Sequence, residues 1–443
     1  MPKFRRNLLG AAGILFFAGT AWAQLLPGVG LPPVSLPTPV AGLPVAGPVL
    51  NSVLSQPGAR QAIRPTLDSV GGLPEAIADS GAPNLLELRR LRLDALIKSN
   101  EAVLERDDRG EPVRRGILVA VDPDSASIQQ AERAGFRLLA DERDPVLGLR
   151  SVKLEVPQGR SARSALKLLA KAAPRLEADY DHVYEPSGGS LAPLATALAA
   201  SAGAGDGRAI GMIDGGVASH PSLAGASIEQ NGFVGDPRPT GHGTAVASLL
   251  VGSQGPFRGA ATGARLYVAD VYGGSQAAGS ASAIVKALGW LAGRRPQVIN
   301  ISLVGPANKL LARAIQIVQS RGIEIVAAVG NDGPAAPPQY PASYPGVLAI
   351  TAVDSHGRAL PEAGKAAHLD FAAPGADMAA ALPGQGYARV RGTSFAAPLA
   401  AARLLEAGSP SRLAAQARPG KGRVGRGIVC GECRIDPKSV GAK

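Results

Sequence analysis

The sequence predicts an α/β protein in which a doubly wound, mainly parallel sheet follows a small α+β unit. Residues 207–408 alternate apolar, β-branched runs with helical stretches, which is typical of parallel strands joined by crossover helices. Over residues 113–185 the spacing of apolar residues switches between that of strands and that of helices, in the order β-α-β-β-α-β of the split βαβ motif. With 443 residues, the chain has room for two or three domains.

The larger region supplies most of the apolar runs. Its expected strands are 209–213, 266–271, 298–303, 323–329 and 347–353, and its clearest helices are 282–292 and 308–320. Ligands of a doubly wound sheet bind at the carboxyl ends of its strands. Polar residues that directly follow these strands are therefore the first candidates for function.

The α+β unit is predicted from shorter signals. Its expected strands are 117–121, 136–139, 152–156 and 176–180. One helix is expected between an N-cap at Asp124 and a stop at Gly135, and a second over 165–173, ended by Pro174. Leucines at helical spacing over 85–97 predict an amphipathic helix within segment 66–112.

Residues 1–23 have the pattern of a secretory signal peptide. Lys3, Arg5 and Arg6 precede an apolar stretch over 8–18, and Ala21-Trp22-Ala23 matches an A-x-A cleavage site. The apolar stretch is short for the ~20 residues of a membrane-spanning helix, which disfavours an uncleaved anchor. We expect an exported protein, whether periplasmic, cell-surface or secreted, that is not an integral membrane protein.

Glycine and proline are concentrated in two segments. The chain has 56 Gly and 37 Pro. The Pro/Gly/Val-rich residues 24–65 are expected to form a semi-rigid linker, because repeated proline favours extended polyproline II. The small residues of 186–206 are expected to form a flexible linker that is open to proteolysis.

The net charge of +11 lies mostly at the two ends. Residues 1–23 carry three basic residues and no acid, and residues 409–443 carry eight basic residues against Glu432 and Asp436. The rest of the chain is close to neutral, so a nucleic-acid groove is not indicated. We expect the basic tail, 409–443, to be a solvated end, with docking to an anionic polymer or lipid as the alternative.

The two cysteines form one CxxC, Cys430 and Cys433, within that tail. A single CxxC lacks the other ligands of a structural zinc site, and in an exported chain a local disulfide is favoured. A reactive or metal-binding pair stays open. No metal ligands are assigned, and no cofactor is expected to be required for chemistry.

The first candidate motif is Asp214-Gly215-Gly216, which directly follows the expected strand 209–213. An acid at this end of a strand is well placed for an active site. An ordinary Asp-Gly turn is the alternative, and for this motif taken alone it is the favoured one.

The second motif, Gly241-His242-Gly243-Thr244, begins an apolar run. A histidine between glycines at the start of a helix can present its imidazole to a cleft. Of the 5 histidines, only His242 has this setting. A buried histidine with ordinary hydrogen bonds is the alternative.

The third motif, Gly392-Thr393-Ser394, opens a helix and continues as Phe395-Ala396-Ala397-Pro398. Ser394 is there either a helix N-cap or a nucleophile whose developing oxyanion faces free backbone N–H groups. A serine needs a base, and that base needs an orienting acid. The order Asp214, His242, Ser394 fits one of the known triad orders, and Ser394 has no G-x-S-x-G elbow.

A fourth segment, 325–333, ends an apolar strand at Asn331. Asn331 is either an ordinary turn residue or a side-chain donor to an oxyanion beside the Ser394 N–H.

Together with Asn300-Ile301-Ser302-Leu303, these motifs resemble the subtilisin-like serine proteases over residues 207–408. The resemblance implies a catalytic triad of Asp214, His242 and Ser394, and an oxyanion hole formed by Asn331 and Ser394. It also implies a substrate-binding set. That set comprises Ser302, Leu303, Val304, Gly305, Ala328 and Gly330.

The resemblance also implies a function for the α+β unit. Subtilases are commonly made with a β-α-β-β-α-β propeptide, so residues 113–185 would be an inhibitory propeptide, with self-cleavage between about Tyr184 and Asp206. The implied protein is a serine endopeptidase made as an autoprocessed zymogen. Its partners would be polypeptide substrates and its own propeptide.

The sequence departs from the family pattern at three places. Gly215 replaces the usual Ser or Thr beside the triad acid. Val304 replaces a usual glycine, which predicts a pocket for small side chains before the scissile bond. The 251–259 loop is shorter than the calcium-binding loop of many members, so structural calcium stays possible but unassigned.

Two non-enzymatic alternatives stay open. One is a catalytically silent binding protein on the subtilase fold. The other is a surface interaction protein whose active parts are the Pro-rich segment and the basic tail.

Overall fold

The structure is a computed structural model that describes residues 82–187, 205–383 and 386–442. The expected signal peptide, the linker over 24–65 and most of the linker over 186–206 lie outside these residues. None of the helices in the described part is both long and apolar enough to span a bilayer.

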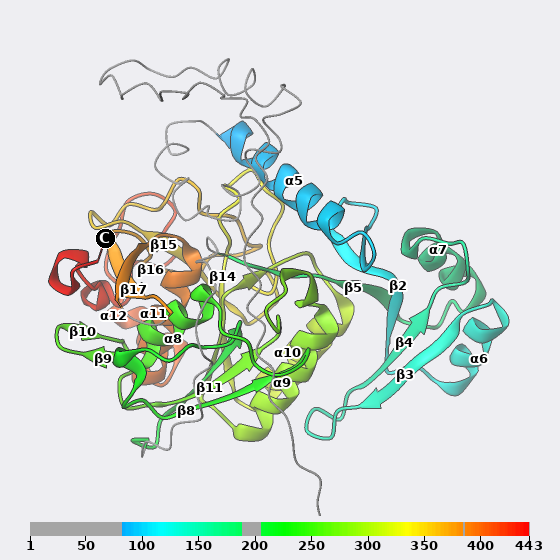
Figure 1. Cartoon of the computed structure of the whole chain (residues 1–443), viewed down its shortest axis with the longest axis horizontal. Coiled ribbons are helices and arrows are strands. Elements are labelled where there is room, and N and C mark those ends of the chain that lie inside the picture. Colours follow the sequence, from blue (N-terminus) through cyan, green and yellow to red (C-terminus); the bar gives the residue numbers. More distant parts are fainter. Residues whose placement is uncertain (1–81, 188–204, 384–385, 443) are drawn as a thin grey trace, which may run out of the picture. The chain divides into compact units, whose positions relative to one another are not determined.

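The large domain, residues 205–442, is built on a seven-stranded sheet with the strand order β16-β15-β14-β12-β7-β11-β8. Strands β8, β11, β14, β15 and β16 of this sheet are labelled in Figure 1. Every neighbouring pair in this sheet is parallel. The strands are β7 (Ala209–Asp214), β8 (Ile228–Gly232), β11 (Arg265–Asp270), β12 (Val298–Ile301), β14 (Glu324–Ala328), β15 (Leu348–Val353) and β16 (Phe371–Pro374). The expected doubly wound α/β fold is confirmed.

Alternate side chains of the strands pack on opposite faces of this sheet, as the period of a β-strand requires. In β7, Ile210 and Met212 join the core beneath α8 (Gly241–Val251) and α11 (Thr393–Ala407). Ile213, the residue after Met212, lies on the opposite face of the sheet and packs with α9 (Ala281–Arg294) and α10 (Lys309–Ser320). Two apolar cores, one on each face, therefore fix the sheet between its helices.

The small domain has the order β-α-β-β-α-β. Its elements are β2 (Pro112–Val121), α6 (Ser125–Arg133), β3 (Arg137–Arg143), β4 (Arg150–Glu155), α7 (Ala162–Ala172) and β5 (Ala178–His182). Asp124 caps α6 and Ser161 caps α7, each by accepting a backbone N–H with its side chain. Alternate residues of β2 and β4, such as Leu118 and Leu154, pack against both helices in a separate core.

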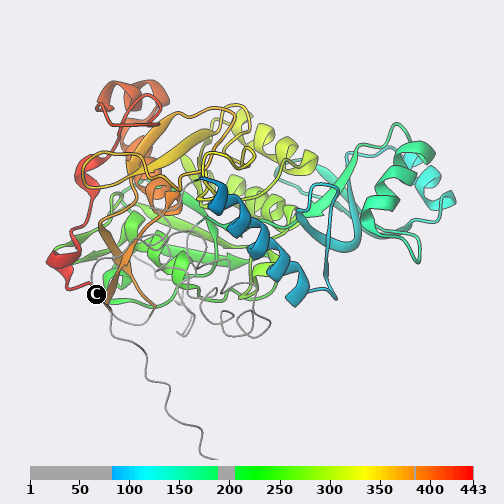
Figure 2. The same ribbon diagram turned by 90° about the horizontal axis from the view of Figure 1, so that it is seen from above.

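One long helix, α5 (Ala82–Ser99), precedes the small domain and is drawn in blue in Figure 2. It is the helix that the leucine spacing predicts. Leu93, Leu96 and Ile97 form its buried stripe. The strand β1 (Leu104–Arg106) follows and pairs with β2, and Leu104 packs with Leu96.

The remaining elements are short. They are β6 (Glu185–Pro186), β9 (Ser253–Gln254), β10 (Phe257–Arg258), β13 (Leu303–Val304), β17 (Met378–Ala381), β18 (Tyr387–Val390), α12 (Pro410–Gln416) and the 3₁₀ turns Pro221–Leu223, Gln276–Ala278, Gly431–Cys433 and Pro437–Val440.

The expectation of a solvated tail over 409–443 is wrong for the residues that the structure describes there. Val429, Cys430 and Ile435 are buried in the core of the large domain. The Val429 N–H donates to the Ala372 carbonyl at 2.8 Å, and the Ala379 N–H donates to the Ile435 carbonyl at 3.0 Å. These apolar residues are too widely spaced to predict a helix or a strand. The many basic residues around them favoured the prediction of a solvated end.

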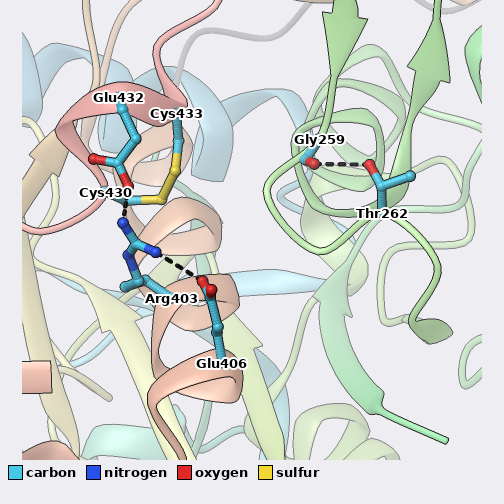
Figure 3. The surroundings of a disulfide bond; sticks show 7 residues. All are labelled: Gly259, Thr262, Arg403, Glu406, Cys430, Glu432 and Cys433. Atoms are coloured by element: carbon cyan, nitrogen blue, oxygen red, sulfur yellow. Dashed lines mark hydrogen bonds and ion pairs between the residues drawn. A yellow bond between two sulfur atoms is a disulfide. The ribbon is translucent and has the colours of Figure 1, made fainter. Parts of the chain in front are cut away.

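Cys430 and Cys433 are joined by a disulfide within this segment (Figure 3). Nearby, Arg403 of α11 forms ion pairs with Glu406, at 2.7 Å, and with Glu432. In the described part, Cys430, Glu432 and Cys433 are the one group with metal-ligand spacing. Both sulfurs are used in the disulfide, so this group is not a metal site in the oxidised chain.

The packed tail gives a stability prediction. Val429→Asp places a carboxylate in an apolar core, and we expect the free energy of unfolding to fall by about 3 kcal/mol or more. Urea denaturation in a Ser394→Ala background, which prevents self-digestion, measures this. Lys438→Asp, at an exposed position of the same tail, is the matched control. A change within about 0.5 kcal/mol for Val429→Asp is the result of a solvated tail and contradicts the packing.

Candidate active site

Asp214 and His242 form a buried hydrogen-bonded pair. Asp214 is the last residue of β7, and His242 lies in the first turn of α8. His242 Nδ1 lies 2.9 Å from each carboxylate oxygen of Asp214, and the two residues are 0% and 3% exposed. A carboxylate in this position fixes the ring and favours the tautomer with hydrogen on Nδ1, which leaves Nε2 as the basic nitrogen.

The helix start at His242 is set by Thr240. Thr240 caps α8 by accepting the Gly243 N–H at 2.9 Å. A Cβ on Gly215 would lie 2.3 Å from the Thr240 hydroxyl oxygen. The missing side chain at position 215 therefore makes room for the N-cap that orients the histidine helix.

Asp270 supports the same loop from the neighbouring strand. It lies beside Asp214 in the parallel register of β11 and β7. Its carboxylate accepts backbone N–H groups from Arg238 at 2.8 Å, from Tyr272 at 2.8 Å and from Gly273 at 3.0 Å. Burial raises the pKa of Asp270 despite these hydrogen bonds, and the nearby Asp214 charge adds to the rise.

Ser394 lies in the first turn of α11, after Gly392 with φ of 142°. Its neighbour Phe395 contacts the His242 ring, with 5.4 Å between ring centroids. Among the described residues, Ser394 Oγ and His242 Nε2 have no hydrogen-bond partner, although both atoms are buried. The structure thus joins Asp214 to His242 and brings Ser394 to the same site without closing the hydroxyl–imidazole bond. Such bonds are often open in the absence of substrate.

Asn331 is held directly beside Ser394. Its side-chain oxygen accepts the Thr393 N–H at 3.0 Å, and the Gly330 N–H donates to the Thr393 hydroxyl at 3.0 Å. These bonds leave the Asn331 amide group free to donate toward the helix start. A Cβ on Gly392 would lie 2.9 Å from the Asn331 Nδ2, which explains glycine there.

The donor of Asn331 is used by the chain itself. Asn331 Nδ2 donates to the carbonyl oxygen of Ser187. The Ser187 N–H donates to the Ser302 carbonyl at 3.0 Å, and Ser302 Oγ donates to the Ser394 carbonyl at 3.0 Å. Ser187 therefore lies between the segment that contains Ser302 and the start of the Ser394 helix.

The residues before Ser187 continue as a strand between two segments of the large domain, and we call the space that this strand fills the cleft. β6 (Glu185–Pro186) pairs antiparallel with β13 (Leu303–Val304), with Leu303 opposite Pro186 and Val304 opposite Glu185. On the other side, the Tyr184 N–H donates to the Gly279 carbonyl at 2.8 Å. An extended peptide bound between two protein segments is the geometry of strand addition.

The other residues of the expected substrate-binding set surround this strand. A Cβ on Gly330 would lie 3.2 Å from Val304 Cγ1, so Val304 faces Gly330 and narrows the space between them. Ala328 ends β14 and is fully buried. A Cβ on Gly305 would lie 2.5 Å from the buried Tyr184 ring, whose hydroxyl donates to the Pro306 carbonyl at 2.8 Å.

Sequence reasoning missed several residues of this site. Thr240 and Asp270 position the loop before His242, and Ser187 lies in the cleft. The carboxylate of Asp332, the residue after Asn331, forms ion pairs with Arg89 and Arg92 of α5. A signal was present for Asp270, an acid at a strand end like Asp214. Ser187 lies within the range from Tyr184 to Asp206 in which cleavage is expected, but no local signal distinguishes it there, because its pairing partners lie more than a hundred positions away.

Comparison with known proteins shows which family the large domain resembles in sequence. Residues 205–409 match the sequence model of the subtilase family. Subtilisin Savinase of Lederbergia lenta is 35% identical over 218 residues, which are 47% of this chain and 79% of that protein. The alkaline protease of Alkalihalobacillus alcalophilus is 35% identical over 218 residues, and the matched part is 56% of its length.

A solved structure extends the likeness of the fold beyond this domain. Fervidolysin from Fervidobacterium pennivorans aligns with 74% of this chain and 62% of its own, with a TM-score of 0.59 and 19% identity. At this identity the likeness concerns the fold alone.

Proposed function

Because the chain belongs to the subtilase family of serine proteases, we propose that it is an exported endopeptidase made as an autoprocessed zymogen. Asp214, His242 and Ser394 are its triad, and Asn331 with the Ser394 N–H is its oxyanion hole. The small domain is its propeptide, and the signal-like residues 1–23 direct its export.

The observation that carries this proposal is the position of Ser187. Its carbonyl oxygen accepts a hydrogen bond from Asn331, and the residues before it pair with β13. A peptide held in this way has its carbonyl group where a donor stabilises the negative charge of an attacked peptide bond. The bond between Ser187 and Gly188 is therefore the proposed processing site.

The proposed mechanism is acyl transfer. His242 Nε2 takes the proton of Ser394 Oγ, and Oγ attacks the peptide carbonyl carbon. Asn331 Nδ2 and the Ser394 N–H donate to the oxyanion. His242 then protonates the leaving amine, and water hydrolyses the ester. Asp214 holds the ring and stabilises its positive charge.

The small domain supports the inhibitory part of the proposal through its contacts with two helix N-termini. Asp181 accepts the Ser282 N–H of α9 at 2.9 Å, and Asp179 accepts the Lys309 N–H of α10 at 2.9 Å. Carboxylates at helix N-termini satisfy free N–H groups and the helix dipole. These contacts anchor β5, whose chain continues directly into the cleft.

The experiment that tests the function uses the full chain. Wild-type protein and Ser394→Ala are treated with a fluorophosphonate after incubation, and intact masses are measured. The proposal expects labelling and release of a fragment that ends at residue 187 from the wild type only. Labelling of Ser394→Ala, or its processing at the same bond, contradicts it. No label and no processing in either is the result of a silent binding protein.

The size of the residue before the cleaved bond gives a further prediction. Ser187→Phe places a large ring where Val304 narrows the pocket, and we expect cleavage at this bond to slow by about 100-fold or more. Ser187→Ala is the control and is expected to process within about threefold of the wild type. The half-time of the full-length mass measures both. Equal rates for Phe and Ala, here or in a peptide library, contradict a narrow pocket.

A further inference from the structure

Helix α5 makes a contact that the processing scheme does not use. The helix precedes the small domain, yet two of its arginines reach Asp332, the neighbour of Asn331. Arg89 Nε lies 3.1 Å from Asp332 Oδ2, and an Arg92 terminal nitrogen lies 3.0 Å from Asp332 Oδ1. The Asp332 side chain is only 6% exposed, so both guanidinium groups cover a nearly buried carboxylate at the rim of the cleft.

The same two arginines bind a carboxylate on each of two other segments. One terminal nitrogen of Arg89, Nη2, lies 2.7 and 2.8 Å from the two carboxylate oxygens of Glu111, which lies in the turn between β1 and β2. Arg92 lies 3.4 Å from both oxygens of Glu185, two residues before Ser187. Three carboxylates from three segments therefore share two guanidinium groups of one helix.

Apolar packing reinforces this charged cluster. Leu85 lies against the loop after Asp332, where a Cβ on Gly333 would be 2.8 Å from Leu85 Cδ1. Leu96 of the same helix packs with Val183, just before the cleft segment, and with Ala277 of the large domain. The helix thus contacts both the occupant of the cleft and the wall of the cleft.

We propose that α5 is a second inhibitory element, an arginine clamp that holds residues 184–187 in the cleft after their bond to Gly188 is cut. The proposal rests on the proposed function. Once that bond is broken, the N-terminal fragment stays by noncovalent contacts alone. Charge-assisted pairs with little exposure slow dissociation more than association. The Arg89 side chain is 13% exposed and that of Arg92 is 46% exposed, while their shared partner Asp332 is 6% exposed, so Arg89 contributes more than Arg92 to the length of the inhibited state.

The test compares full-chain variants that process themselves. Arg89→Gln/Arg92→Gln removes the clamp charges, and Arg90→Gln is the matched control. Arg90 is on the same helix, its side chain is 70% exposed, and its described ion pair is with Glu87. Mass spectrometry first establishes cleavage after Ser187. Peptide hydrolysis on serial dilution then gives the dissociation constant of the fragment.

We expect the double variant to cleave after Ser187 and to raise this dissociation constant by about tenfold or more. Arg90→Gln is expected to stay within about twofold of the wild type. A double variant that also stays within about twofold overturns the clamp. If no protein is processed or labelled, the proposed function fails instead, so the two failures are distinct.

A second variant covers the case in which the double variant does not fold. Leu85→Ala keeps every charge and removes the contact with Gly333, and we expect the dissociation constant to rise by about threefold or more. An unchanged constant for Leu85→Ala, with the double variant unfolded, also overturns the proposal, because α5 would then serve folding alone.

Discussion

Replacing Ser394 with alanine is expected to abolish peptide hydrolysis and to leave the chain at full length. The Ser394 hydroxyl is the group proposed to form the ester, because the neighbouring Thr393 hydroxyl is already bound by the Gly330 N–H. Without it, His242 Nε2 has no hydroxyl proton to accept. In subtilisin, loss of the corresponding group costs about 2 × 10⁶ in kcat. A loss of this order is therefore expected for a peptide substrate.

The measurement is kcat for a peptide substrate together with the intact mass after prolonged incubation. Ser320→Ala is the matched control, because Ser320 is exposed at the end of α10 and its hydroxyl donates to the Ile317 carbonyl of the same helix. It should process and hydrolyse peptides like the wild type. Maturation of pure Ser394→Ala to the same size, without an added protease, would refute self-cleavage.

Replacing Asn331 with alanine is expected to cripple the enzyme without silencing it. The change removes the donor that binds the Ser187 carbonyl, and therefore the donor to any oxyanion formed at that position. In subtilisin, loss of such a donor costs about 10²–10³ in kcat. The effect should fall on kcat and leave KM nearly unchanged, because the charge develops only in the transition state.

A companion variant separates this effect from structural damage. Asn331 also accepts the Thr393 N–H at 3.0 Å, and Asn331→Asp keeps that acceptor while losing the donor. Both variants should lose activity, and Asn331→Asp should keep the melting temperature of the wild type. A loss below about tenfold in Asn331→Ala contradicts the oxyanion role.

Much of the fold follows from local sequence signals. Five of the seven sheet strands are apolar runs of the kind that a parallel strand buried on both faces requires. The two that sequence reasoning missed are the edge strands. β8 is largely polar, since one of its sides has no partner strand, and β16 ends at Pro374, which an edge position tolerates.

The residues of the candidate site were predictable where they directly follow the end of an apolar strand. Asp214 and Asn331 each follow an apolar run, and parallel strands place their carboxyl ends at one edge, even though β12 separates β7 from β14. Thr240 was hidden because its role depends on the space left by Gly215. The C-terminal segment was misjudged because its charged residues outnumber the few apolar ones that anchor it.

The sequence by itself determined the five central strands of the sheet, the order of the small domain and the residue types needed for acyl transfer. Each is encoded locally, either by the spacing of apolar residues or by a motif a few residues long. Only the tertiary structure decided what fills the cleft and what covers it. The Ser187–Asn331 contact joins residues 144 positions apart, and the Arg92–Asp332 contact joins residues 240 positions apart. No local pattern encodes such pairs, because they form only when separately folded elements pack together.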